Sequence, residues 1–104
     1  MTKSVEQWIR LSEYRLKSAH VLHESGQHLD AVFNLQQAVE LMMKAWVANR
    51  TQKNPPKTHD LIELAGLVEA IPPTQRHVLE ELHDVRVPLR YPDDFDEALE
   101  ALHL

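Results

Sequence analysis

The stretch that decides the fold is residues 28–50, HLDAVFNLQQAVELMMKAWVANR. It contains no Gly or Pro and is rich in Ala, Leu, Met, Glu and Gln, which all favour helix. Its apolar residues recur at steps of three and four. One stripe is formed by Leu35, Ala38, Val39, Met42, Ala45 and Trp46, and it is widened by Val32, Phe33, Leu41, Met43 and Val47. A helix that is apolar around most of its circumference lies inside a bundle or against another chain. We therefore expect this helix to be central.

One narrow polar edge interrupts this helix, and it consists of Gln36, Gln37, Glu40 and Lys44. Glu40 precedes Lys44 by four residues, the favourable order for a helical ion pair. These side chains either line a polar pocket or an interface between chains, or they form the solvated edge of a mostly buried helix. Spacing alone favours the solvated edge, in which Glu40 and Lys44 make an ordinary surface pair.

A helix is also predicted before this stretch, over about residues 4–25. Ser4 can cap its start, because a serine hydroxyl accepts a hydrogen bond from an unpaired backbone N–H. Gly26 ends it, because glycine tolerates the left-handed turn that follows many helices. The stripe expected to face the bundle consists of Val5, Trp8, Ile9, Ser12, Leu16, Ala19 and Leu22.

Prolines divide the rest of the chain. Thr58 or Asp60 caps a third helix, which Pro72 and Pro73 stop. Thr74 caps a fourth helix that runs to about Val87. The inner residues are predicted to be Leu61, Leu64, Ala65 and Val68 in the third helix and Val78, Leu79, Leu82 and Val85 in the fourth. A short acidic helix over 93–104 follows. The fold class is therefore all-α, an up-down antiparallel helical bundle of four to five helices.

The length and composition of the chain limit the classes of protein to which it can belong. The chain has 104 residues, no cysteine and a net charge of −5. This length suits one domain over residues 1–104. Because cysteine is absent and no apolar run approaches a membrane span, we expect a cytoplasmic protein with no membrane association. The start, MTKSVEQWIR, lacks the apolar block of a signal peptide.

The charge is unevenly distributed along the chain. Residues 1–57 carry a net charge of +3 and residues 58–104 a net charge of −8. A protein surface attracts the phosphates of a nucleic acid through clustered positive charge. The charge of this chain therefore disfavours a broad surface that binds nucleic acid. The asymmetry instead suits association between two copies or two partners with complementary fields.

Seven histidines are present, and two of them, His20 and His23, lie three residues apart beside Glu24. They could hold a metal with a third ligand from elsewhere, but the sequence contains no HExxH motif and no dense ligand cluster. We expect solvated histidines, no metal site and no cofactor.

Two clusters could act on phosphate. Arg76 and His83 could serve a metal-independent phosphodiester reaction, with the arginine stabilising charge and the histidine moving a proton. Seven residues place them about 10 Å apart along a helix, and the neighbouring Glu80, Glu81 and Asp84 would repel RNA. The alternative is a solvated helix face.

The second cluster is Arg86, Arg90 and Tyr91, held between Pro88 and Pro92. Proline restricts the backbone, so these side chains would be presented with little freedom to grip an anion. The alternative is a structural role, in which Arg90 pairs with a nearby carboxylate and Tyr91 covers the end of the bundle.

Three pieces of the chain together resemble the HEPN domain family. The first is the Gly26 turn followed by DAVF at 30–33, QQAVE at 36–40 and Lys44-Ala45. The second is KTHDL at 57–61, and the third is RYPD at 90–93. The resemblance covers roughly residues 8–94 and is closest to the branch that bears Arg-Tyr-Pro-Asp.

The resemblance implies a four- or five-helix bundle that usually dimerises through its long helices. It implies frequent coupling to a small nucleotidyltransferase encoded beside it, often as a toxin–antitoxin pair. Some members are RNases with an arginine–histidine motif, whose loosest spacing Arg76 and His83 fit; others bind nucleotides or proteins.

Three functions follow as hypotheses. The leading one is a non-catalytic module that dimerises, binds a nucleotide or another phosphate-bearing ligand near Arg86, Arg90 and Tyr91, and partners a nucleotidyltransferase. The second is an RNase toxin that uses Arg76 and His83. The third is a domain that serves protein assembly alone.

Overall fold

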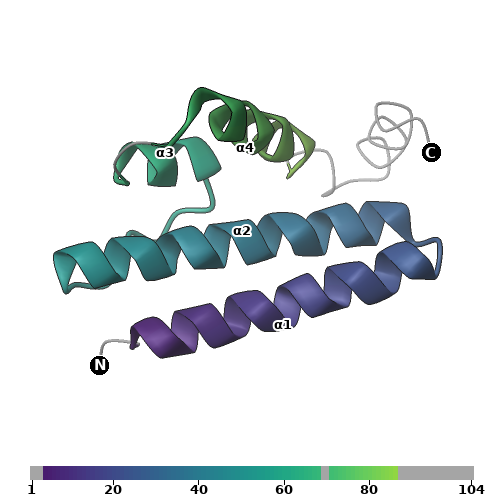
Figure 1. Ribbon diagram of the computed structural model, residues 1–104, viewed down its shortest axis with the longest axis horizontal. Coiled ribbons are helices and arrows are strands. Elements are labelled where there is room, and N and C mark those ends of the chain that lie inside the picture. The colour runs from purple at the N-terminus through teal and green to yellow at the C-terminus, as the bar shows by residue number, and fades with distance from the viewer. Residues whose placement is uncertain (1–3, 69–70, 87–104) are drawn as a thin grey trace.

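The computed structural model describes residues 4–68 and 71–86, which form four helices. These are α1 (Val5–Glu24), α2 (His28–Thr51), α3 (Leu61–Gly66) and α4 (Pro73–Arg86). α1 and α2 form an antiparallel pair, and α3 and α4 lie on the other side of α2 (Figure 1). α2 contacts all three other helices. The predicted all-α bundle with residues 28–50 at its centre is thus confirmed, while the helix predicted over 93–104 lies outside the described residues.

Local hydrogen bonds fix both ends of α1 as predicted. The Ser4 hydroxyl accepts from the Gln7 backbone N–H at 3.2 Å, and the Gln7 side chain accepts from the Ser4 N–H at 2.8 Å. At the other end Gly26 adopts a φ of 84° and donates its N–H to the His23 carbonyl at 3.1 Å. This left-handed residue reverses the chain within a few residues and makes α1 and α2 antiparallel neighbours.

Small residues at intervals of seven form the contact between α1 and α2. α1 contributes Ser12 and Ala19, and α2 contributes Ala31, Ala38 and Ala45, all buried. The Ser12 hydroxyl donates to the Ala38 carbonyl oxygen at 2.7 Å. Because the separation of two helix axes depends on the side chains between them, small residues here bring the helices close together.

A second core lies between α2, α3 and α4. Its buried members are Met43, Leu61, Leu64, Ala65 and Leu79, with Val39, Ile62, Ile71 and Leu82 packed around them. Val68 is also buried. All four inner residues predicted for the third helix are therefore confirmed, and so is Leu79 in the fourth.

Two helix boundaries differ from the prediction. α3 ends at Gly66, before the expected stop at Pro72, because glycine is a poor helix former and the next two N–H groups bond to carbonyls three residues back. α4 begins at Pro73, so Thr74 lies inside the helix and does not cap it. Proline suits a first helical position, since its missing N–H would have no partner there.

Several residues predicted to face the core are exposed instead. Leu16 on α1 and Val78 on α4 are about half exposed, and Leu35, Met42 and Trp46 on α2 are 36%, 42% and 46% exposed. The reason is geometric: α1 covers one side of α2 and the α3–α4 pair another, which leaves a third side open. The side chain of Val85 lies outside the described part of the chain.

The small-residue contact predicts the effect of enlarging Ala38. Ala38→Leu should destabilise the protein by about 1–3 kcal/mol, because the added methyl groups push α1 and α2 apart. Urea unfolding followed by circular dichroism measures the change. Glu13→Leu, on the exposed side of α1, is the control and should change stability by less than about 0.5 kcal/mol. An Ala38→Leu variant as stable as the wild type would contradict the close contact.

Candidate functional site: a buried polar cluster beside an exposed apolar face

The polar edge of α2 lies inside the protein. Gln36, Glu40 and Lys44 are 2%, 3% and 6% exposed, and Gln37 is half-buried. The expectation of a solvated edge with an ordinary surface ion pair is therefore wrong for the first three. The residues fall on the side of α2 that the chain covers after it leaves the helix. The spacing of residues along the helix does not show which groups cover this side.

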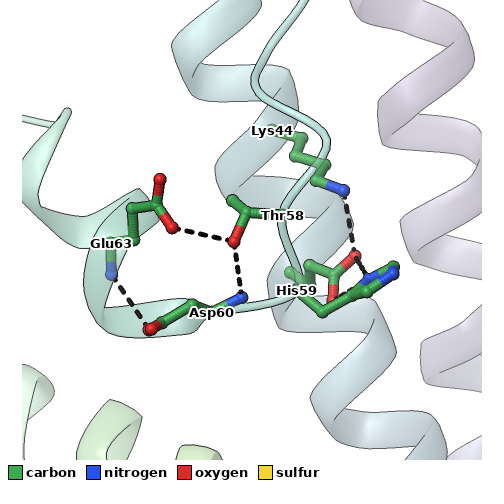
Figure 2. A network of polar contacts seen from close by, with 6 residues as sticks. Lys44, Thr58, His59, Asp60 and Glu63 are labelled. Carbon is green, nitrogen blue, oxygen red and sulfur yellow. Dashed lines mark hydrogen bonds and ion pairs between the residues drawn. The ribbon is translucent and has the colours of Figure 1, made fainter.

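Glu40 is the centre of this cluster. Its carboxylate accepts from the Lys44 ammonium at 3.1 Å and from His59 Nδ1 at 3.1 and 3.2 Å (Figure 2). A carboxylate can only accept, so His59 must carry its proton on Nδ1. The Lys44 ammonium also lies 5.9 Å from the centre of the Trp8 ring, within the range of a cation–π contact. The two buried charges thus neutralise each other.

The segment that carries His59 is held by its own hydrogen bonds. Thr58 Oγ1 accepts from the Asp60 N–H at 3.1 Å and donates to Glu63 at 2.9 Å. The Asp60 carboxylate caps α3 by accepting from the N–H groups of Ile62 and Glu63. The capping role predicted for Asp60 is confirmed. His59 is therefore placed between a buried carboxylate on one side and a rigid helix cap on the other.

No hydrogen bond is seen from the second nitrogen of the His59 imidazole to residues 4–68 or 71–86. Its side chain is 65% exposed, while Glu40 beneath it is 4% exposed. A carboxylate that holds Nδ1–H fixes the tautomer and orientation of the ring and leaves Nε2 toward solvent. Such a pair can transfer a proton or accept a hydrogen bond at the surface. Sequence spacing missed His59, although its place in the KTHDL segment was a signal.

Gln36 joins α2 to α4. Its amide nitrogen donates to the Leu82 carbonyl at 2.8 Å, whereas its amide oxygen has no hydrogen-bond partner within residues 4–68 and 71–86. The bond holds α4 near its C-terminal end. The polar residues of α2 therefore contact both segments that follow this helix.

Arg76 and His83 make separate contacts on α4. The Arg76 guanidinium lies 4.0 Å from Glu80, with both side chains about half exposed. His83 Nδ1 lies 3.6 Å from the Asp60 carboxylate, a distance too long for a hydrogen bond but suited to an ion pair when the imidazole is protonated. Each residue is thus engaged with a different carboxylate.

The predicted anion cluster falls largely outside the described residues. Arg86 is the last residue of α4, and its side chain is not among those described; Arg90 and Tyr91 also lie outside them. Their role as a ligand site remains a prediction.

Two apolar grooves flank the exposed side of α2. One, of about 330 Å³, lies between α2 and α4 and includes Met42, Trp46 and Val78 in its wall. The other, of about 420 Å³, lies between α1 and α2 and includes Leu16 and Leu35. The exposed apolar residues noted above therefore belong to one face that spans three helices.

Two of the histidines, His23 and His28, lie together although the sequence did not indicate that they would. His23 meets His28 across the turn between α1 and α2, with the two Nδ1 atoms 3.2 Å apart. Within the described ranges, no group of three or more acidic or histidine side chains has the geometry of a metal site. None of the helices in those ranges is sufficiently long and apolar to span a bilayer.

Comparison with known families gives one match. A family model described as HEPN domain matches residues 5–104. No curated protein and no solved structure matches the chain significantly.

The buried cluster predicts a large cost for neutralising Glu40. Glu40→Gln should destabilise the protein by about 3–5 kcal/mol, because it leaves the Lys44 ammonium buried without a counter-charge. Chemical unfolding measures the loss. Combining it with Lys44→Met should recover much of the stability, since the stranded charge is then removed.

The matched control for this prediction is Glu80→Gln on α4. Its partner Arg76 is about half exposed, so the pair contributes little and the loss should stay below about 0.5 kcal/mol. Equal effects of Glu40→Gln and Glu80→Gln would mean that Glu40 is solvated.

Proposed function

Since the chain belongs to the HEPN family, we propose that it is a non-catalytic, cytoplasmic HEPN module, a single domain over residues 1–104, that pairs with a second copy through the exposed face of α2. In this proposal the pair binds a nucleotide or another phosphate-bearing ligand near Arg86, Arg90 and Tyr91. It also partners a small nucleotidyltransferase in a toxin–antitoxin type of system.

The exposed apolar face of α2 is the observation that carries the proposal. Leu35, Val39, Met42 and Trp46 follow one another at steps of four, three and four residues. This is the spacing with which helices pair in coiled coils. Leu35, Met42 and Trp46 are each more than a third exposed, which is a large apolar surface for a helix at the centre of its bundle.

The neighbouring helices extend this face. Leu16 of α1 and Val78 of α4 line the grooves on its two sides. A helix from a second copy would therefore meet apolar side chains across three helices. The uneven charge along the chain supports the same kind of association, because opposite fields on two copies attract.

The contacts on α4 favour the non-catalytic form over an RNase. A reaction at one phosphate needs Arg76 and His83 to reach the same atoms. Arg76 instead faces Glu80, and His83 faces Asp60. Both carboxylates would oppose an approaching phosphate.

Replacing Trp46 tests the pairing. Trp46→Glu should convert a dimer of about 24 kDa into the 12.1 kDa monomer, because it places a charge in the centre of the apolar face. Size-exclusion chromatography with light scattering measures the mass. Tyr14→Glu changes a more exposed aromatic residue of α1 that lines neither of the two grooves described above, and it should leave the dimer intact. A wild-type monomer at micromolar concentration would refute the pairing.

Replacing Arg90 tests the ligand. ATP or a related nucleotide should raise the melting temperature of the wild type, and Arg90→Ala should remove this shift because a guanidinium is a strong phosphate partner. Arg76→Ala is the control and should retain the shift. If no nucleotide changes the melting temperature, the ligand proposal fails and assembly alone remains. Growth arrest on expression that His83→Ala abolishes would favour the RNase.

A further inference from the structure

The turn between α1 and α2 holds two histidines at a fixed separation. Gly26 donates to the His23 carbonyl and Gln27 donates to the Leu22 carbonyl at 2.8 Å, the pair of bonds that defines a Schellman turn. Ser25 adds a bond from its hydroxyl to the Leu22 carbonyl at 2.9 Å. This network brings the first residue of α2, His28, back over the last turn of α1, so the backbone places His23 and His28 within reach of each other.

The two rings converge. Their Nδ1 atoms lie 3.2 Å apart, the ring centres are 5.1 Å apart and the ring planes meet at 60°. A tetrahedral ion with bonds of about 2.0–2.1 Å to nitrogen holds two ligand nitrogens about 3.3 Å apart and their ring centres about 5.2 Å apart. The observed separation of the ring centres therefore agrees with two Nδ1 atoms that bind the same ion. Without an ion, the same separation of the Nδ1 atoms lets one ring donate an N–H···N hydrogen bond to the other.

We propose that His23 and His28 bind a divalent transition-metal ion, with zinc as the representative, through their Nδ1 atoms. Neutral imidazole is a common ligand for such ions, and both rings can present an Nδ1 lone pair when their protons are on Nε2. No third protein ligand is in place among the described residues, so solvent completes the coordination shell. This proposal does not depend on the phosphate ligand proposed above.

The surroundings of the turn suit a cation. The carbonyl end of α1 carries partial negative charge, and Glu24 is adjacent to His23. The N-terminus of α2 opposes a cation, and Asp30 in its first turn offsets that effect. His23 is exposed and His28 is half-buried at the end of the groove between α1 and α2, so an ion can reach both rings in the single chain.

Binding would fasten the two long helices together at their connection. An ion that binds only the folded chain stabilises it by mass action. Metal bound at the α1–α2 turn would then stabilise the antiparallel pair of helices.

The test is a zinc titration of the full chain without a polyhistidine tag, followed by calorimetry. We expect one zinc per chain, and His23→Ala or His28→Ala should each weaken binding by roughly tenfold or more. His77→Ala is the matched control: His77 is exposed on α4 and lies 3.1 Å from Glu81, a second pair that could bind metal at the surface. It should leave the affinity unchanged.

Two further measurements test whether zinc binds at His23 and His28. Zinc should raise the melting temperature of the wild type and of His77→Ala, but not of His28→Ala. Nitrogen-15 spectra of the histidine rings should show zinc at Nδ1 of His23 and His28. Unchanged affinity in both turn variants, or the absence of binding up to millimolar zinc, would overturn the proposal.

Discussion

The carboxylate of Glu40 is the group on which the arrangement of this chain depends. It lies midway along α2, is almost fully buried and bonds Lys44 within its own helix and His59 nineteen residues later. A buried carboxylate is costly unless it is paired and hydrogen-bonded. The segment after α2 must therefore pass over Glu40 to place His59 there. Asp60 follows directly and caps α3, so the position of α3 follows from the pairing of Glu40.

The helices themselves were largely predictable, because the signals that start and end them are local. Ser4 with Gln7, the Gly26 turn and the Asp60 cap each involve residues within a few positions of one another. Pro73 marks a boundary in the sequence, and in the structure it also begins α4, because a first helical position needs no N–H donor. Gly66 ends α3 early because a short helix has few internal hydrogen bonds to offset a weak helix former.

The inner side of α2 was not predictable from spacing. A polar stripe beside an apolar one normally faces water, yet the partners of Gln36 and Glu40 are the Leu82 carbonyl and His59, which are 46 and 19 residues away. Periodicity shows which residues share a face and carries no information on what covers it. The meeting of His23 with His28 was missed for a related reason: five residues apart in sequence, they are joined by the geometry of a turn.

The two sides of α2 together support the proposed pairing with a second copy. Polar groups that would normally keep a helix soluble are used inside the chain, so the open side is left with Leu35, Met42 and Trp46. In a symmetric dimer the residues at the two-fold axis face their own copies, and a charge there would repel itself. The exposed stripe from Leu35 to Trp46 carries no charge. Burial of Glu40 and Lys44 within one chain therefore makes the open side of α2 compatible with a two-fold axis.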